Sequence, residues 1–316
     1  MKSTMTCLFA AALGTTLPAA SVWAETPPAA GLPAMVSLAS TGLTARFADV
    51  VYGEVSAAQK FDVYLPESAD SPYPVIVFIH GGGFRFGDKQ MVSPAMVRGF
   101  LNAGFAVVST NYRLSDEATF PAASQDIGLA LEFLRNNADQ YDIDPDKLVV
   151  MGESAGANLA ALAGTAAANG VMRGALLDRD ADIRPQAVVA LYPPVDFLQL
   201  DELMKAQGCP EANHNSADSF ESRYLGGALS SKTAEAEAAN PITHIDSRTP
   251  PFLIQSGTAD CQIGSGQSKL LASALQARLV NVTHEQLEGA GHGGPQFETG
   301  ANISSLVFWM RKTLGL

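Results

Sequence analysis

The sequence predicts one α/β domain with a mostly parallel, eight-stranded sheet and helices on both faces. Short, unbroken runs of apolar and β-branched residues recur along the chain, as in strands that are buried on both faces of a sheet. Stretches with helical three-to-four spacing separate these runs, and this alternation is typical of a parallel sheet. The 316 residues, 47% of them hydrophobic, are enough for one sizeable core.

Eight segments carry a strand pattern. Residues 47–55 and 60–65 alternate apolar and polar side chains and are joined by a short turn, so we expect an antiparallel edge there. The last predicted strand, 282–287, also alternates. Between them lie five continuous apolar runs, at residues 75–79, 106–109, 148–151, 187–191 and 252–254.

The helical pattern is clearest in residues 122–141, where Ile127, Leu131 and Leu134 fall on one face. A short helix near Leu198–Met204 is a candidate wall of an acyl pocket. The other predicted helices are residues 154–168, 265–277 and 303–314.

The first 24 residues have the pattern of a secretory signal peptide. Lys2 provides a positive start, Leu8–Leu17 is apolar, and the segment ends in the small residue Ala24. The apolar run is too short to span a bilayer. We therefore expect cleavage near Glu25, no stable membrane insertion afterwards, and a secreted or periplasmic protein; an uncleaved anchor is the alternative.

The rest of the chain divides into an arm and one domain with an insertion. Residues 25–45 are rich in Pro, Ala and Gly and predict a loosely ordered arm before a domain at 46–316. Residues 207–240 are polar and interrupted by Gly and Pro, and they break the strand–helix alternation. An insertion of this length in a compact domain indicates a functional cap.

The net charge limits the classes of partner that the protein can bind, and the cysteine content bears on whether it forms a disulfide. A net charge of −12 argues against a nucleic-acid partner, because phosphate backbones need clustered Lys and Arg. Cys7 lies in the signal segment, which leaves Cys209 and Cys261. An even pair in an exported protein predicts a disulfide, and two free thiols are the alternative. The oligomeric state has no signal in the sequence.

The sequence Gly152-Glu153-Ser154-Ala155-Gly156 directly follows a predicted strand and opens a predicted helix. The side chain of a serine on such a tight turn projects beyond the sheet edge and is exposed there. The flanking glycines relieve the crowding that the turn creates. The helix N-terminus beneath it favours developing negative charge. Ser154 is therefore the candidate nucleophile, and a plain glycine-rich turn is the alternative.

A second glycine motif, His80-Gly81-Gly82-Gly83, follows the strand at 75–79. Consecutive glycines let the backbone approach a ligand and turn several N–H groups toward one point. Gly81, Gly82, Gly83 and Ala155 are thus the candidate oxyanion hole for a tetrahedral intermediate. We expect His80 to hold this loop rather than act as a base.

A serine nucleophile needs a base and an acid that orients the base. His292 is the candidate base because it lies in a glycine-rich loop after the last predicted strand; His244 and His284 are its competitors. Asp260 follows the strand at 252–254 and keeps the chain order Ser, Asp, His. Asp196, which also follows a strand, is the alternative acid.

These motifs together carry a family resemblance. The chain resembles the hormone-sensitive-lipase-like and feruloyl/acetyl-xylan-esterase-like branch of the α/β hydrolases in the segments His80–Phe84, Asn111–Leu114, Pro121–Asp126, Gly152–Gly156, Pro251–Asp260 and Gly289–His292. The resemblance implies the α/β-hydrolase fold and hydrolysis of carboxylic esters without a metal or organic cofactor. Phe84 departs from it, since many relatives have Trp there.

We therefore expect a secreted serine carboxylesterase that works through an acyl-enzyme, on short-chain acyl esters or carbohydrate-linked acetyl and feruloyl esters. An aryl ester or amide (formamidase-like) hydrolase is the alternative, and a non-catalytic binding module is a third. Candidate substrate-binding residues are Phe84, Glu153 and Tyr192, with Phe86 and Phe220 as further pocket-wall candidates. A Cys209–Cys261 bond would tether the cap to the acid loop.

Overall fold

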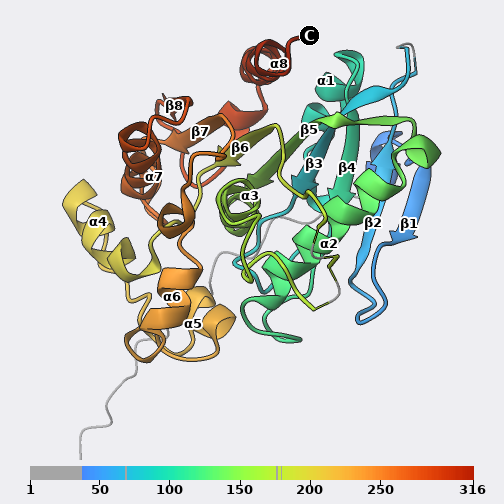
Figure 1. Ribbon diagram of the computed structural model, residues 1–316. Coiled ribbons are helices and arrows are strands. Elements are labelled where there is room, and N and C mark those ends of the chain that lie inside the picture. The colour runs from blue at the N-terminus through green and yellow to red at the C-terminus, as the bar shows by residue number, and fades with distance from the viewer. Residues whose placement is uncertain (1–37, 68–69, 176, 179) are drawn as a thin grey trace, which may run out of the picture. The chain divides into compact units, whose positions relative to one another are not determined.

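The computed structural model describes residues 38–67, 70–175, 177–178 and 180–316. These residues form an eight-stranded sheet in the order β1-β2-β4-β3-β5-β6-β7-β8 (Figure 1). β2 is antiparallel to β1 and to β4, and every other neighbouring pair is parallel. The strands are β1 (Phe47–Val51), β2 (Lys60–Tyr64), β3 (Tyr73–Ile79), β4 (Ala106–Thr110), β5 (Ile143–Glu153), β6 (Ala187–Leu191), β7 (Phe252–Gly257) and β8 (Val282–Leu287).

The predicted fold class is confirmed, because this sheet with its helices has the α/β-hydrolase architecture. The bounds of β6 and β8 agree with the sequence prediction residue for residue. β5 is longer than predicted, since it starts at Ile143, and β1 is shorter, since it ends at Val51. The expected antiparallel edge lies at β1 and β2.

Eight α-helices accompany the sheet in the described residues. The predicted helix at 122–141 is an α-helix followed by a 3₁₀ turn at Ala138–Tyr141. Three helices were not predicted: Pro94–Asn102 and, within the expected cap, Phe220–Leu225 and Thr233–Ala238. The helices are α1 (Pro94–Asn102), α2 (Ala122–Asn136), α3 (Ala155–Thr165), α4 (Leu200–Gln207), α5 (Phe220–Leu225), α6 (Thr233–Ala238), α7 (Ser265–Ala277) and α8 (Gly300–Leu314).

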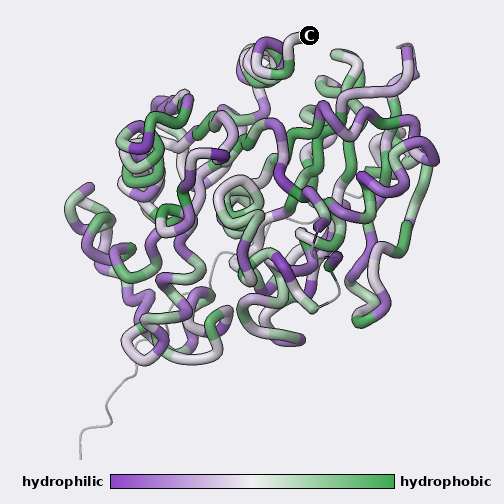
Figure 2. Tube along the Cα trace, viewed as in Figure 1, coloured by the Kyte–Doolittle hydropathy of each residue, from purple (hydrophilic) through white to green (hydrophobic). Residues whose placement is uncertain are grey.

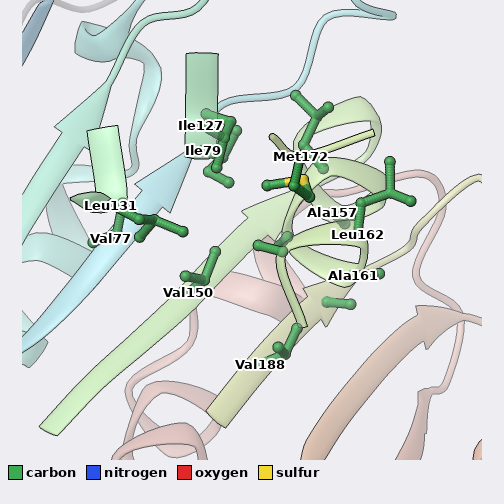
Figure 3. Close-up of a cluster of buried hydrophobic side chains, with 14 of the residues drawn as sticks. Val77, Ile79, Ile127, Leu131, Val150, Ala157, Ala161, Leu162, Met172 and Val188 are labelled. Atoms are coloured by element: carbon green, nitrogen blue, oxygen red, sulfur yellow. The ribbon is translucent and has the colours of Figure 1, made fainter. Parts of the chain in front are cut away.

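Alternate side chains of the parallel strands point into two hydrophobic cores, one on each face of the sheet. In β3, Val77 and Ile79 face the core that α2, α3 and α7 cover, and Figure 3 shows them beside side chains of α2 and α3. Ile76 and Phe78 face the opposite core, under α1 and α8. The central strands are accordingly drawn largely as hydrophobic in Figure 2. Burial on both faces explains why the strands have continuous apolar runs.

The expected arm at 25–45 differs from the structure in its described part. Leu38–Thr41 form a 3₁₀ helix, and Leu38 and Leu43 are buried in the core under α1 and α8. These apolar side chains belong to the same buried cluster as Tyr64. The compact unit therefore begins before residue 46. The predicted signal segment, 1–24, lies outside the described residues.

The segment between β6 and β7 contains the predicted cap at 207–240. It holds α4, α5 and α6, which Figure 1 shows gathered on the same side of the fold as α7. The polar sequence of this region forms short helices that end at glycines, with Gly208 after α4 and Gly226 after α5 in the left-handed conformation. The cap is thus folded, but from small elements.

Candidate active site

The turn between β5 and α3 presents Ser154 at the carboxyl edge of the sheet. Ser154 has φ 51° and ψ −123°, a strained conformation for a residue with a side chain. Its N–H donates to Leu191 O at 2.9 Å, which continues the pairing of β5 with β6 up to the turn. The predicted strand–turn–helix context of the serine is therefore present, and its side chain keeps partial exposure.

Both glycines that flank this serine are required by close packing. A Cβ at Gly152 would lie 2.2 Å from Gly156 O, and a Cβ at Gly156 would lie 2.1 Å from Ile79 O. No side chain larger than hydrogen fits at either position. The second contact also fixes the serine turn against the end of β3, where the glycine triplet begins.

The structure brings Ser154, His292 and Asp260 into one hydrogen-bonded chain. Ser154 Oγ lies 2.7 Å from His292 Nε2. His292 Nδ1 lies 2.8 Å from Asp260 Oδ2, and since the carboxylate can only accept this bond, Nδ1 carries the proton. The Nε2 atom is then the acceptor that faces the serine hydroxyl.

Asp260 is held as a buried carboxylate. Its Oδ1 accepts the N–H groups of Gln262 at 2.9 Å and Ile263 at 3.1 Å, so both oxygens are engaged. Burial alone raises the pKa of Asp260, but the hydrogen bond and charge of His292 and the two N–H donors outweigh it and lower the pKa. The side chain is therefore an anion that can orient His292.

The competing acid and bases are engaged elsewhere. Asp196 caps a 3₁₀ turn by accepting Leu198 N–H at 3.0 Å. His244 contacts Asn169 and the Ala238 carbonyl, and His284 lies within β8 beside Ser256. None of the three is hydrogen-bonded to Ser154 or His292 among the residues described.

The glycine loop after β3, the predicted oxyanion hole, lies next to Ser154. Gly82 and Gly83 have φ values of 101° and 60°, and a Cβ at Gly82 would lie 2.1 Å from Phe86 O. A Cβ at Gly81 would lie 3.2 Å from Ser154 Cβ, which places the loop next to the serine. Within the described chain, no hydrogen bond from the protein occupies the N–H of Gly82 or Gly83.

His80 is placed as a supporting residue. Its ring is buried and stacks on Tyr112 with ring centres 4.5 Å apart. Its Nδ1 donates to Gly81 O at 2.8 Å, and Tyr112 donates to His80 O at 3.0 Å. Burial lowers the pKa of His80 to about 4, so the imidazole is neutral at pH 7.

Two of the three predicted substrate-binding residues lie beside the candidate base. Tyr192 donates to Glu153 Oε2 at 2.9 Å, and its ring packs edge-on against His292 with centres 4.8 Å apart. Burial raises the pKa of Glu153, although the Tyr192 hydrogen bond opposes this shift. The hydrogen-bonded pair of Glu153 and Tyr192 thus packs against one side of the His292 imidazole.

Phe84, the third predicted substrate-binding residue, has a buried side chain. It has φ 59°, and its ring stacks on Tyr224 of α5 with centres 3.8 Å apart. The contact joins the glycine loop to the cap. The aromatic residue in this position therefore holds the cap in place.

The cap is also attached to the acid loop. Cys209 and Cys261 are paired as a disulfide in the structure, with a sequence separation of 52. The sequence reasoning missed Gln207, whose Nε2 donates to Asp260 O at 2.8 Å and whose Oε1 accepts Ser265 N–H at 2.9 Å. A single glutamine carries no sequence signal for such a contact.

Two further cap residues lie close to the site. Phe220 covers the glycine loop, since a Cβ at Gly83 would lie 2.6 Å from Phe220 Cγ. Glu221 is buried and its Oε2 has no hydrogen-bond partner. Burial raises the pKa of Glu221, and the nearby His214 and His292 oppose this shift. Phe220 was a predicted wall residue, whereas Glu221 was missed.

The described residues contain no group of three or more His, Cys, Asp or Glu side chains arranged to hold a metal ion. They also contain no helix with the length and apolar character needed to cross a bilayer.

A comparison with known protein families shows which family the chain belongs to. The family model described as BD-FAE matches residues 61–275, which is more than half of the chain. The chain belongs to the BD-FAE family. The matched region of this BD-FAE protein contains Ser154 and Asp260, and His292 follows it.

Similar proteins are named as esterases. The BD-FAE chain is 28% identical to Esterase LipQ of Mycobacterium tuberculosis over 83% of its own length, and it spans 59% of that relative. It is 30% identical to Carboxylesterase NlhH of the same organism, with 74% and 70% of the two chains covered. It therefore spans little more than half of the first of these relatives.

A solved structure titled "Truncated form of carbohydrate esterase from gut microbiota" is similar over 87% of this chain and 98% of that chain, with a TM-score of 0.77 and 27% identity. A second, a bifunctional GH43-CE protein of Bacteroides eggerthii, has a TM-score of 0.75 and 29% identity, and the similarity covers 85% of this chain and 35% of that one.

Proposed function

We propose that this protein is a serine carboxylesterase that hydrolyses carbohydrate-linked or other short-chain acyl esters through an acyl-enzyme. The observation that carries the proposal is the hydrogen-bonded chain from Ser154 through His292 to Asp260, with contacts of 2.7 and 2.8 Å. This arrangement has the order and atom contacts that a serine nucleophile, a base and an orienting acid require.

In the first half of the reaction, Ser154 Oγ attacks the ester carbonyl carbon while His292 Nε2 takes the hydroxyl proton. The carbonyl oxygen becomes an oxyanion that the N–H groups of Gly82, Gly83 and Ala155 stabilise; Gly81 borders the serine. When the intermediate collapses, the ester C–O bond breaks and His292 gives its proton to the departing alcohol.

In the second half, a water molecule attacks the acyl-serine carbonyl. His292 takes a proton from this water and then returns it to Ser154 Oγ, which releases the carboxylic acid. Asp260 stays ionised throughout and stabilises the imidazolium, as its lowered pKa supports. The protein's own side chains thus account for both halves.

The substrate class rests on the relatives and on the cap. Two similar structures carry the words carbohydrate esterase or GH43-CE in their titles, and a third is titled "acetyl ester-xyloside bifunctional hydrolase". The third is 20% identical and supports the fold alone. The cap offers polar side chains beside aromatic ones, which suits an ester of a hydroxylated molecule.

We also propose export from the cytoplasm. Lys2, the apolar Leu8–Leu17 and the small residue Ala24 support a cleaved signal peptide. A polymeric carbohydrate ester is met outside the cytoplasm, so export is consistent with the proposed substrate. N-terminal sequencing of the exported protein should start near Glu25; a start at Met1 would contradict the cleavage.

The test is a set of initial rates on p-nitrophenyl esters from acetate to palmitate, methyl ferulate and acetylated xylan. We expect activity on the short esters and on at least one carbohydrate-linked ester. Ser154→Ala should reduce kcat by about 10³-fold or more, because the nucleophile is lost. Ser304→Ala, on the exposed face of α8, is the matched control and should keep the rate. Hydrolysis of amides alone would support the formamidase-like alternative instead.

A further inference from the structure

A cavity of about 540 Å³ lies at the residues that directly follow the glycine triplet. Most of its wall comes from two loops, one with Arg85, Phe86 and Gly87 after β3, the other with residues between Asn111 and Glu117 after β4; Ala58, between β1 and β2, completes it. β3, β4 and β5 are parallel, so both loops emerge from the same sheet edge as Ser154. Ligands of open α/β sheets bind at this edge.

The cavity wall is continuous with the candidate oxyanion loop. Gly82 O accepts the N–H groups of Arg85 at 3.1 Å and Phe86 at 2.9 Å, so the turn that carries the oxyanion glycines runs directly into the wall. On the cap side, Phe220 lies over Gly83 and meets the Phe86 ring edge-on with centres 6.0 Å apart. Phe86 and Phe220 therefore connect the cavity to the reaction site.

The chemistry of the wall suits a neutral, hydroxylated ligand. Phe86 is 39% exposed, and the Arg85 guanidinium carbon lies 5.1 Å from its ring centre, so part of the ring is covered and part offers an apolar surface. Arg85, Asp116 and Glu117 supply donors and acceptors. Arg85 Nε already pairs with Asp116 Oδ2 at 3.2 Å. Arg223 Nη1 lies 4.0 Å from Asp116 Oδ1 on the other side of this carboxylate and does not line the cavity. The lining therefore has the carboxylates of Asp116 and Glu117 and the already paired guanidinium of Arg85, which disfavours an anionic ligand. A sugar ring combines an apolar C–H face with hydroxyl groups.

We propose that this cavity is a subsite for a neighbouring sugar unit of a carbohydrate ester. Arg85, Phe86 and Asp116 form the subsite, and the acylated unit lies at Ser154. The inference rests on the proposed esterase function. The subsite would bind a sugar unit of the substrate that the catalytic residues do not contact. It requires a ligand longer than one sugar.

The experiment compares Phe86→Ala, Asp116→Asn and a matched control, Phe308→Ala, an exposed phenylalanine of α8. Three substrates are used: p-nitrophenyl acetate, a monoacetylated methyl xyloside and acetylated xylo-oligosaccharides. We expect Phe86→Ala to reduce kcat/KM on the oligosaccharides about 10-fold more than on the other two, mainly through KM. Asp116→Asn should show a smaller loss with the same preference, and Phe308→Ala should show none.

An equal loss on all three substrates would overturn the subsite, because it would mean that Phe86 acts through the oxyanion turn. An unchanged oligosaccharide KM in both variants would overturn it too. Calorimetric titration of Ser154→Ala with unacetylated xylo-oligosaccharide measures the subsite without catalysis, and Phe86→Ala in that background should weaken binding. If the wild type binds the sugar but hydrolyses no ester, the proposed function fails and the subsite stands.

Discussion

The loops that carry the triad and the cap that covers them are built differently. Asp260 accepts two backbone N–H groups as well as the imidazole, and Ser154 is fixed by pairing to Leu191 and by the packing of Gly156. The cap instead holds two helices of six residues each and a buried carboxyl oxygen without a partner. The triad is thus held by backbone contacts at the sheet edge, whereas the cap is built from short helices and contains an unpaired buried oxygen.

This contrast teaches where mutations should act. Conservative changes of the triad side chains should reduce kcat with little effect on stability, because the backbone contacts of their loops remain. Changes in the cap should act on stability or KM. The two regions are connected at Gln207 and at the Cys209–Cys261 pair, which join the cap to the loop of Asp260. Changes there should therefore affect both stability and activity.

The largest effect is expected for Asp260→Asn. The amide cannot orient His292 with Nδ1–H toward an acceptor as the carboxylate does, and kcat should fall by about 10⁴-fold. The melting temperature should change little, because the amide oxygen can still accept a backbone N–H. Steady-state kinetics and thermal unfolding check both. Asp196→Asn is the matched control, and a larger loss there would show that the acid is misassigned.

We expect the disulfide to contribute more to the stability of the folded protein than to its hydrolysis rate. Replacing Cys209 and Cys261 by Ser should lower the free energy of unfolding by up to about 4 kcal/mol, because the 52-residue loop is no longer closed in the unfolded chain. The rate on p-nitrophenyl acetate should fall only a few-fold, since Gln207 and the backbone donors still hold Asp260. Denaturant unfolding measures the stability.

Reduction of the wild type should reproduce that loss of stability, and the double Ser variant should not respond to a reductant. Two free thiols in the unreduced wild type, found by alkylation and mass spectrometry, would contradict the pairing.

The smallest effect concerns Glu221 in the cap. Burial raises its pKa, so the folded protein holds this proton to a higher pH than the unfolded chain does. Stability therefore falls as the pH rises through the ordinary carboxyl range toward the raised value. His214, Asp201 and His292 are the charged or titratable groups that act on it.

Glu221→Gln should remove this pH dependence and raise the free energy of unfolding at pH 7 by about 1 kcal/mol. Unfolding curves at several pH values measure it, with the exposed Glu202→Gln as control. A less stable Glu221→Gln protein would mean that the carboxylate is held by a favourable charge pair, and the cap would then resemble the sheet-edge loops.

Most of the fold and the arrangement of Ser154, His292 and Asp260 could be predicted from the sequence. Continuous apolar runs identify strands that are buried on both faces, and residues directly after parallel strands must meet at one edge. The contacts of Gln207, Phe220 and Glu221 could not be predicted, because they depend on how short helices pack across the chain. The stacking of Phe84 on Tyr224 could not be predicted for the same reason, since the two residues lie 140 positions apart.

The central claim is that Ser154 is the nucleophile, and covalent labelling tests it most directly. The purified protein is treated with an aryl phosphate such as paraoxon, digested, and mapped by mass spectrometry. We predict one adduct, on Ser154, formed together with complete loss of esterase activity and absent from Ser154→Ala. An adduct on another residue that accounts for the lost activity, or full activity retained in Ser154→Ala, would contradict the account.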